Sequence, residues 1–161
     1  MYYVNYFFIF SMLGHFLEVF FFNNGKSGIL YSYWTPIYGI GVVIILLLYN
    51  RIKKWNTSNF SKLLTLFLYS SIILCTIEAF GGYLIKWIFN TEIWNCENHL
   101  FNIGRYTSLI MAFIWGTSSI IVIYIFKPIV DKFVFKIPRI FSLVLITMFI
   151  LDLIATLTFK T

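Results

Sequence analysis

The chain has 161 residues, of which 60% are hydrophobic, 22% aromatic and only 11% charged. A soluble domain carries about 25% charged residues, so this composition excludes an ordinary water-soluble domain and favours a protein embedded in lipid. The net charge of +6 does not indicate a nucleic-acid partner, because the basic residues lie mostly between apolar runs, where they read as membrane topology.

Four apolar runs are long enough to cross a bilayer, because a spanning helix needs about 20 mostly apolar residues. They are Tyr2–Phe22, Leu63–Ile85, Tyr106–Phe126 and Ile140–Phe159. A fifth run, Pro36–Tyr49, is short and spans only if Ile29–Thr35 also enters the membrane. Pro36, which lacks an amide donor, would then kink that helix or end a re-entrant segment.

These runs predict an all-α fold, a polytopic membrane helical bundle with about five transmembrane helices. We expect a single membrane domain over residues 1–161. Its four-helix core would cover residues 1–127, and a basic loop plus a fifth helix would cover residues 128–161. Such a multi-pass protein has the lipid bilayer as its first partner and belongs in the cell (inner) membrane.

The basic residues predict the orientation of the chain. They concentrate in the connections Asn50–Lys62 and Lys127–Arg139, which the positive-inside rule places in the cytoplasm. The N-terminus is then inside and the C-terminus outside. The connections Asn23–Thr35 and Lys86–Gly104 face outward.

Two glutamates lie inside apolar runs in matching surroundings. Glu18 and Glu78 each follow a serine by seven residues and precede a phenylalanine by two. A carboxylate in a lipid-spanning helix is costly, so it marks a functional site or a buried contact. Arg105 is the strongest candidate cation. The predicted topology places all three, together with Asp152, in the outer half of the bilayer.

Two interpretations of this charged trio remain open. In the first, Glu18 and Glu78 bind a cation or proton in a polar site open to the outside, and Arg105 completes the network. In the second, the three groups form a structural ion pair network between helices. Both interpretations predict that the three side chains meet.

Other residues join the candidate site with simpler alternatives beside them. His15 lies three residues before Glu18 on the same helical face and could relay protons, or only hydrogen-bond a neighbour. Trp34 and Tyr38 could line a pocket, or belong to an interfacial aromatic belt. Asn102, in the outer connection, completes the ligand or ion-site candidates. The candidates for close helix packing or kinks are Gly14, Pro36, Gly39, Gly104 and Gly116.

The chain also shows a pattern that repeats. Glu18 is followed by Tyr38-Gly39, an apolar run and the basic Arg51. In the same order, Glu78 is followed by Trp115-Gly116, an apolar run and the basic Lys127. This order predicts a two-hairpin internal repeat, although such a short match also arises by chance in so apolar a chain.

No catalytic or metal-binding motif is visible, so we expect no enzyme, no catalytic residue, no metal and no cofactor. An intramembrane enzyme using His15, Glu18 and Glu78 is the least favoured alternative. The two main hypotheses are a transport component for a small solute and a non-transport membrane scaffold or regulatory subunit. In the second, the charged network is purely structural.

Several segments resemble one family of membrane proteins. Leu13-Gly14, followed by Glu18, is similar to the family's opening signature, and Thr35-Pro36-Ile37-Tyr38-Gly39 is similar to a second segment. The most specific elements are Pro36-Ile37-Tyr38-Gly39 and Gly104-Arg105. Gly104-Arg105 and Trp115-Gly116 follow in the same order. Over about residues 8–132 the chain resembles the CmpB-like family of type IV ABC-transporter permeases. The resemblance implies a permease-like membrane protein, which would dock a separate ATPase subunit, and it does not specify the solute. Because four or five helices enclose little space, we also expect a homo-oligomer or a partner subunit.

Overall fold

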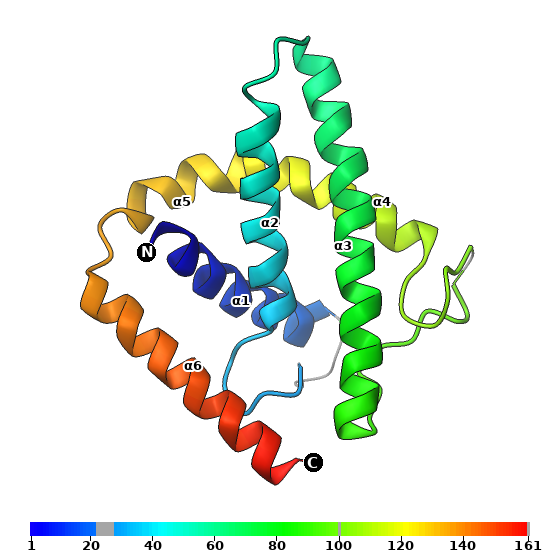
Figure 1. Ribbon diagram of the computed structural model, residues 1–161, viewed down its shortest axis with the longest axis vertical. Coiled ribbons are helices and arrows are strands. Elements are labelled where there is room, and N and C mark those ends of the chain that lie inside the picture. Colours follow the sequence, from blue (N-terminus) through cyan, green and yellow to red (C-terminus); the bar gives the residue numbers. More distant parts are fainter. Residues whose placement is uncertain (22–27, 100, 161) are drawn as a thin grey trace. The chain divides into compact units, whose positions relative to one another are not determined.

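The computed structural model describes residues 1–21, 28–99 and 101–160, and these residues are mainly helical (Figure 1). The part of the predicted connection Asn23–Thr35 that falls on residues 23–27 lies outside the described residues. The helices are α1 (Tyr2–Phe21), α2 (Pro36–Ile52), α3 (Asn59–Phe89), α4 (Leu109–Ile121), the π-helical turn η1 (Val122–Phe126), α5 (Lys127–Val134) and α6 (Arg139–Phe159).

Four helical segments of the described chain are long and apolar enough to cross a membrane, as the sequence predicts. They are Tyr2–Phe21, Asn59–Phe89, Leu109–Val134 and Arg139–Phe159. The predicted helical bundle is therefore confirmed. The fifth helix, α2, has 17 residues, about 26 Å at 1.5 Å per residue, which is shorter than a hydrocarbon core of about 30 Å.

Pro36 does not kink a longer helix but begins α2. The preceding residues, 29–35, are not helical, so they do not lengthen the helix. A proline suits the first position of a helix, because the amide at that position has no intrahelical partner and the ring fixes a helical φ.

The helix α3 is longer than the predicted run Leu63–Ile85 and has 31 residues. The Oγ of Ser58 accepts a 3.1 Å hydrogen bond from the amide of Ser61 and caps its beginning. At its end Asn90 has a left-handed backbone with φ 50°, a common helix stop. At about 1.5 Å per residue α3 measures roughly 46 Å, so its ends extend beyond the hydrocarbon core.

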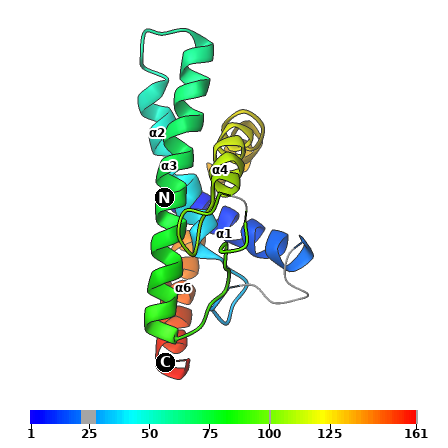
Figure 2. The same cartoon turned by 90° about the vertical axis from the view of Figure 1, so that its right-hand side faces the viewer.

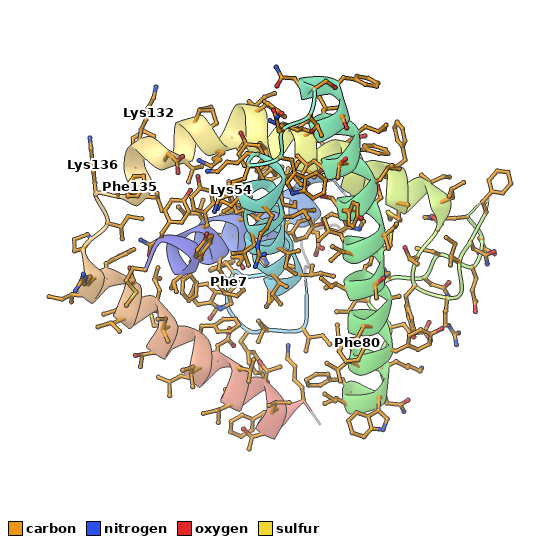
Figure 3. All side chains as sticks on the ribbon, turned by 45° about the horizontal axis from the view of Figure 1, so that its top comes forward. Phe7, Lys54, Phe80, Lys132, Phe135 and Lys136 are labelled. Atoms are coloured by element: carbon orange, nitrogen blue, oxygen red, sulfur yellow. The ribbon has the colours of Figure 1, made fainter. Side chains whose placement is uncertain are left out.

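The prediction of a basic loop over Lys127–Arg139 is wrong for most of its length, because α5 continues the helix to Val134. Pro128 lies inside this continuation. A proline removes a hydrogen bond and crowds the preceding turn, and the π-helical turn η1 directly before it widens the helix there. The side chains of Lys132 and Lys136 are exposed and extend away from the ribbon (Figure 3).

The described residues form two compact units, which are described separately. The first comprises Met1–Val43 and Val130–Thr161. Here the hydroxyls of Tyr2 and Tyr6 donate to Oδ1 of Asp131 at 2.8 and 2.9 Å. The Oγ of Ser142 donates at 2.6 Å to Oδ1 of Asn5, whose Nδ2 donates to a backbone carbonyl of α5. These bonds join the beginning of α1 to both α5 and α6.

The second unit is Ile44–Ile129 and contains α3, α4 and the end of α2. The end of α2 and the beginning of α3 lie side by side and are joined by a short connection (Figures 1 and 2). The helix α4 packs across the middle of α3. The single domain with a four-helix core over residues 1–127 stays a prediction.

Candidate functional site

Glu78 is buried in the second unit, with only 7% of its surface exposed. It lies on α3, and its Oε2 accepts a 3.1 Å hydrogen bond from the hydroxyl of Thr107, just before α4. Trp115, on α4, is the second side chain that interacts with the carboxylate. Polar groups of Thr107 and Trp115, both on the segment that follows α3, thus contact a carboxylate on a mostly apolar helix.

The short segment before α4 positions Thr107. Ser108 caps α4, since its Oγ accepts a 3.2 Å hydrogen bond from the amide of Met111, so the helix begins at Leu109 rather than at the predicted Tyr106. The ring of Tyr106 covers Gly82 of α3, where a side chain on the glycine would collide with it. These contacts hold residues 106–108 against α3, and Thr107 therefore faces Glu78.

Arg105 has other partners than Glu78. Its Nη2 lies 3.2 Å from Oε1 of Glu92, and its Nε lies 3.4 Å from Oε1 of Glu97. Lys86 also pairs with Glu92, at 3.5 Å. The Arg105 side chain is 43% exposed, so this ion-pair network lies at the surface of the connection between α3 and α4. The structure does not bring Arg105 into an ion pair with Glu78.

The outer connection also contains Asn102 and Gly104. The Nδ2 of Asn102 donates a 3.1 Å hydrogen bond to the carbonyl of Glu97, and Asn102 pairs with Ser108 in an isolated β-bridge. Gly104 has φ 74°, a left-handed conformation that favours glycine. Both residues shape this connection rather than kinking a membrane helix.

Glu18 and His15 belong to the first unit, on α1. Glu18 is partly buried. His15 is 8% exposed, and its ring meets that of Tyr33 edge-on at 5.4 Å. Its Nδ1 is buried without a hydrogen-bond partner among the described residues. Glu18 acts electrostatically on His15, as their spacing predicts. The meeting of Glu18 with Glu78 stays a prediction.

Trp34 is buried rather than part of an interfacial belt, with 4% of its surface exposed. Its Nε1 donates a 2.8 Å hydrogen bond to Oδ2 of Asp152 on α6. The amides of Tyr31 and Ser32 donate to the same carboxylate at 3.0 Å each, and the Thr156 hydroxyl lies at 3.4 Å. Asp152, which had no visible partner in the sequence, therefore fixes the segment before α2 to α6.

The predicted packing glycines lie at close helix contacts. In the first unit, a side chain on Gly39 would collide with the Oγ of Ser11 and with Phe7. One on Gly14 would collide with the ring of Tyr38. Close approach of two helices requires such small residues, so these glycines act in packing.

The second unit repeats one of these contacts. There a side chain on Gly116 would collide with the Oγ of Ser71 and with the ring of Phe67. Ser71 and Phe67 precede Glu78 by the same seven and eleven residues that separate Ser11 and Phe7 from Glu18. The two helix pairs thus share one contact at matching positions, as the predicted repeat requires.

The sequence did not identify four of the partner residues in these contacts. Thr107 and the pair Glu92 and Glu97 lie in a connection whose course the apolar pattern does not specify. Asp131 lies among basic residues and read as part of a loop. One sequence signal could have located Thr107. Ser108 is a serine directly before an apolar run, a pattern that is typical of a helix N-cap, and it places Thr107 just before the helix. No group of three metal-ligating side chains occurs among the described residues.

The long apolar helices and the buried acids on them define a multi-pass α-helical membrane protein. Within this class, the chain belongs to the family described as "Putative ABC-transporter type IV", whose model matches residues 5–157. No curated protein and no solved structure matches the chain. The family is the one that the resemblance indicated, and it extends over α6 as well.

Proposed function

We propose that this chain is the membrane component of an ABC-type transporter and that it binds a proton or a small cation at a polar site facing outward. One observation carries the proposal: Glu78 is 7% exposed on a membrane helix and meets a hydroxyl of Thr107. No basic side chain pairs with it in the part of the chain that the structure describes. A carboxylate in such surroundings takes up a proton or a cation.

In this proposal the other candidate residues have supporting roles. Glu18, in the first unit, is a second acidic candidate for binding a proton or a cation, and His15 relays protons to it along one face of α1. Arg105 with its two acidic partners forms the charged entrance from outside. Trp34 and Tyr38 help to line the surroundings of Glu18. In this orientation the N-terminus lies inside and the C-terminus outside. The family description, which is that of a transporter, favours this role over an enzyme.

The test is Glu78→Gln, which removes the charge and keeps the shape and the hydrogen bond from Thr107. We expect wild-type protein levels and thermal stability. We also expect loss of the stabilisation that Na⁺, K⁺ or a change of pH gives the purified wild type. Lys132→Gln, which neutralises an exposed charge outside the proposed site, is the control and should keep that stabilisation. Collapse of Glu78→Gln levels, or an unchanged ion response, would contradict the proposal.

The second candidate function is a non-transport scaffold or regulatory subunit. Asp152 favours it, because this buried acid of α6 accepts four hydrogen bonds from its own chain and needs no ligand. If Glu78 has a similar role, its substitution destabilises the protein and lowers the protein level. The protein level of Glu78→Gln thus separates the two functions.

A transporter of this kind needs further subunits. The described chain offers few helices to enclose a solute path, so we propose assembly with a second copy or with a separate ATPase subunit. Cross-linking of the membrane-embedded protein tests assembly with a second copy. A covalent dimer at low protein concentration supports a homo-oligomer, and the absence of a covalent dimer contradicts a homo-oligomer.

A further inference from the structure

A cavity of about 530 Å³ lies in the second unit where α2 ends and α3 begins. It is lined by seven residues from α2, α3, η1 and the connection between α2 and α3: Tyr49, Lys53, Asn59, Phe60, Lys62, Leu63 and Tyr124. None of the candidate site residues is among them. The cavity is therefore distinct from the surroundings of Glu78 and needs an explanation of its own.

The cavity is positively charged. Lys53 and Lys62 are the charged residues in its lining, and the lining contains no acid. The Nζ of Lys62 donates a 3.4 Å hydrogen bond to the carbonyl of Lys53. The Nζ of Lys53 lies 5.9 Å from the centroid of the Tyr49 ring. These contacts hold two ammonium groups at one cavity, where they attract an anion.

The beginning of α3 adds to this charge. Asn59 and Phe60, the first two residues of α3, line the cavity, and the first turn of α3 contains no acidic residue. A helix N-terminus presents free amides and a partial positive charge. Two lysines and a helix N-terminus thus act on the same space.

The rest of the lining is apolar and aromatic. Tyr49 and Tyr124 meet edge-on with ring centroids 6.4 Å apart, and Phe60 is 73% exposed beside Leu63. A soluble phosphate would use the lysines but would leave this wall uncovered. A phospholipid satisfies both parts, since its phosphate is anionic and its acyl chains are apolar.

We propose that this cavity binds the phosphate headgroup of an anionic phospholipid, with its acyl chains along Phe60 and Leu63. Basic pockets between membrane helices on the cytoplasmic side bind such headgroups. The proposal matches the predicted cytoplasmic position of the connection between α2 and α3. It does not depend on the transport function.

The test measures binding of fluorescent phosphatidylglycerol to the purified full chain in neutral detergent, with phosphatidylcholine as the uncharged comparison. We expect phosphatidylglycerol to bind at least 10-fold more tightly. Lys53→Gln/Lys62→Gln should lose about 10- to 30-fold in affinity, and Lys53→Arg/Lys62→Arg should keep most of it. The control, Lys132→Gln/Lys136→Gln, removes two exposed lysines outside the cavity (Figure 3) and should change affinity less than 3-fold.

Three outcomes would overturn the proposal. Equal binding of both lipids would show that the cavity does not recognise charge. An equal loss in the control pair would show that only overall charge matters. Competition by millimolar glycerol phosphate, with no preference for the lipid, would show that the site takes a soluble phosphate instead.

Discussion

The indole Nε1 of Trp34 donates a 2.8 Å hydrogen bond to Oδ2 of Asp152 and so joins the segment before α2 to α6. The carboxylate also accepts from two consecutive backbone amides. A single acid on the last helix thus fixes the place where α2 begins.

Asp152→Asn should destabilise the protein by about 1–3 kcal/mol, because the amide nitrogen cannot accept hydrogen bonds and leaves a buried donor without a partner. The loss of stability is measured by thermal unfolding of the wild type and of Asp152→Asn in detergent. Glu97→Gln, an exposed acid, serves as the control and should have little effect. Equal melting temperatures for Asp152→Asn and wild type would mean that this carboxylate does not fix the segment.

Gly39→Ala and Gly116→Ala should each destabilise the protein by about 1–3 kcal/mol, because the added methyl group collides with the opposite serine and phenylalanine. Effects of similar size are expected, since the two contacts match. Thr117→Ala, next to Gly116 on α4, is the control. A large effect at one glycine and none at the other would argue against equivalent contacts.

Arg105→Gln should cost less than about 1 kcal/mol of stability, because its ion pairs with Glu92 and Glu97 are largely exposed to solvent. The difference in unfolding free energy between wild type and Arg105→Gln should be smaller still in 1 M salt, where exposed charges are screened. Unfolding at low and high salt checks both statements. A loss of several kcal/mol would indicate a buried role for the guanidinium.

Cys96 should react slowly with maleimide, because it is only 1% exposed and burial raises the pKa of its thiol. A raised pKa means less thiolate at a given pH, so the rate should keep rising with pH beyond the usual range of a free cysteine, about 8.5. A Cys75→Ser variant isolates Cys96. Exposed Asn95→Cys, in a chain without other cysteines, is the reference, and an equal rate there would contradict the buried environment.

The sequence predicted the helical segments because a spanning helix needs a long apolar run, and such a run is visible in the order of the residues. It also located Glu78 and the packing glycines, since acids and glycines stand out in such runs. The ends of helices were harder. Pro128 and the lysines around it resembled a loop, but a π-helical turn accommodates the proline and the helix continues.

The partners of the charged residues could not be predicted in the same way. Arg105 was expected to meet Glu78 because their predicted depths agree. The folded connection instead provides Glu92 and Glu97, which are closer along the chain and accessible to water. Depth in the membrane restricts a side chain along one direction only, and the course of a connection determines the other two.

The π-helical turn Val122–Phe126 changes the face of the helix on which the following residues lie. Each residue of an α-helix advances the phase by about 100°, so the residue added in a π turn rotates everything after it by that angle. The residues that follow the turn therefore present a different face from the one that an uninterrupted α-helix would present. Deleting one residue within the turn would rotate that face by about 100°.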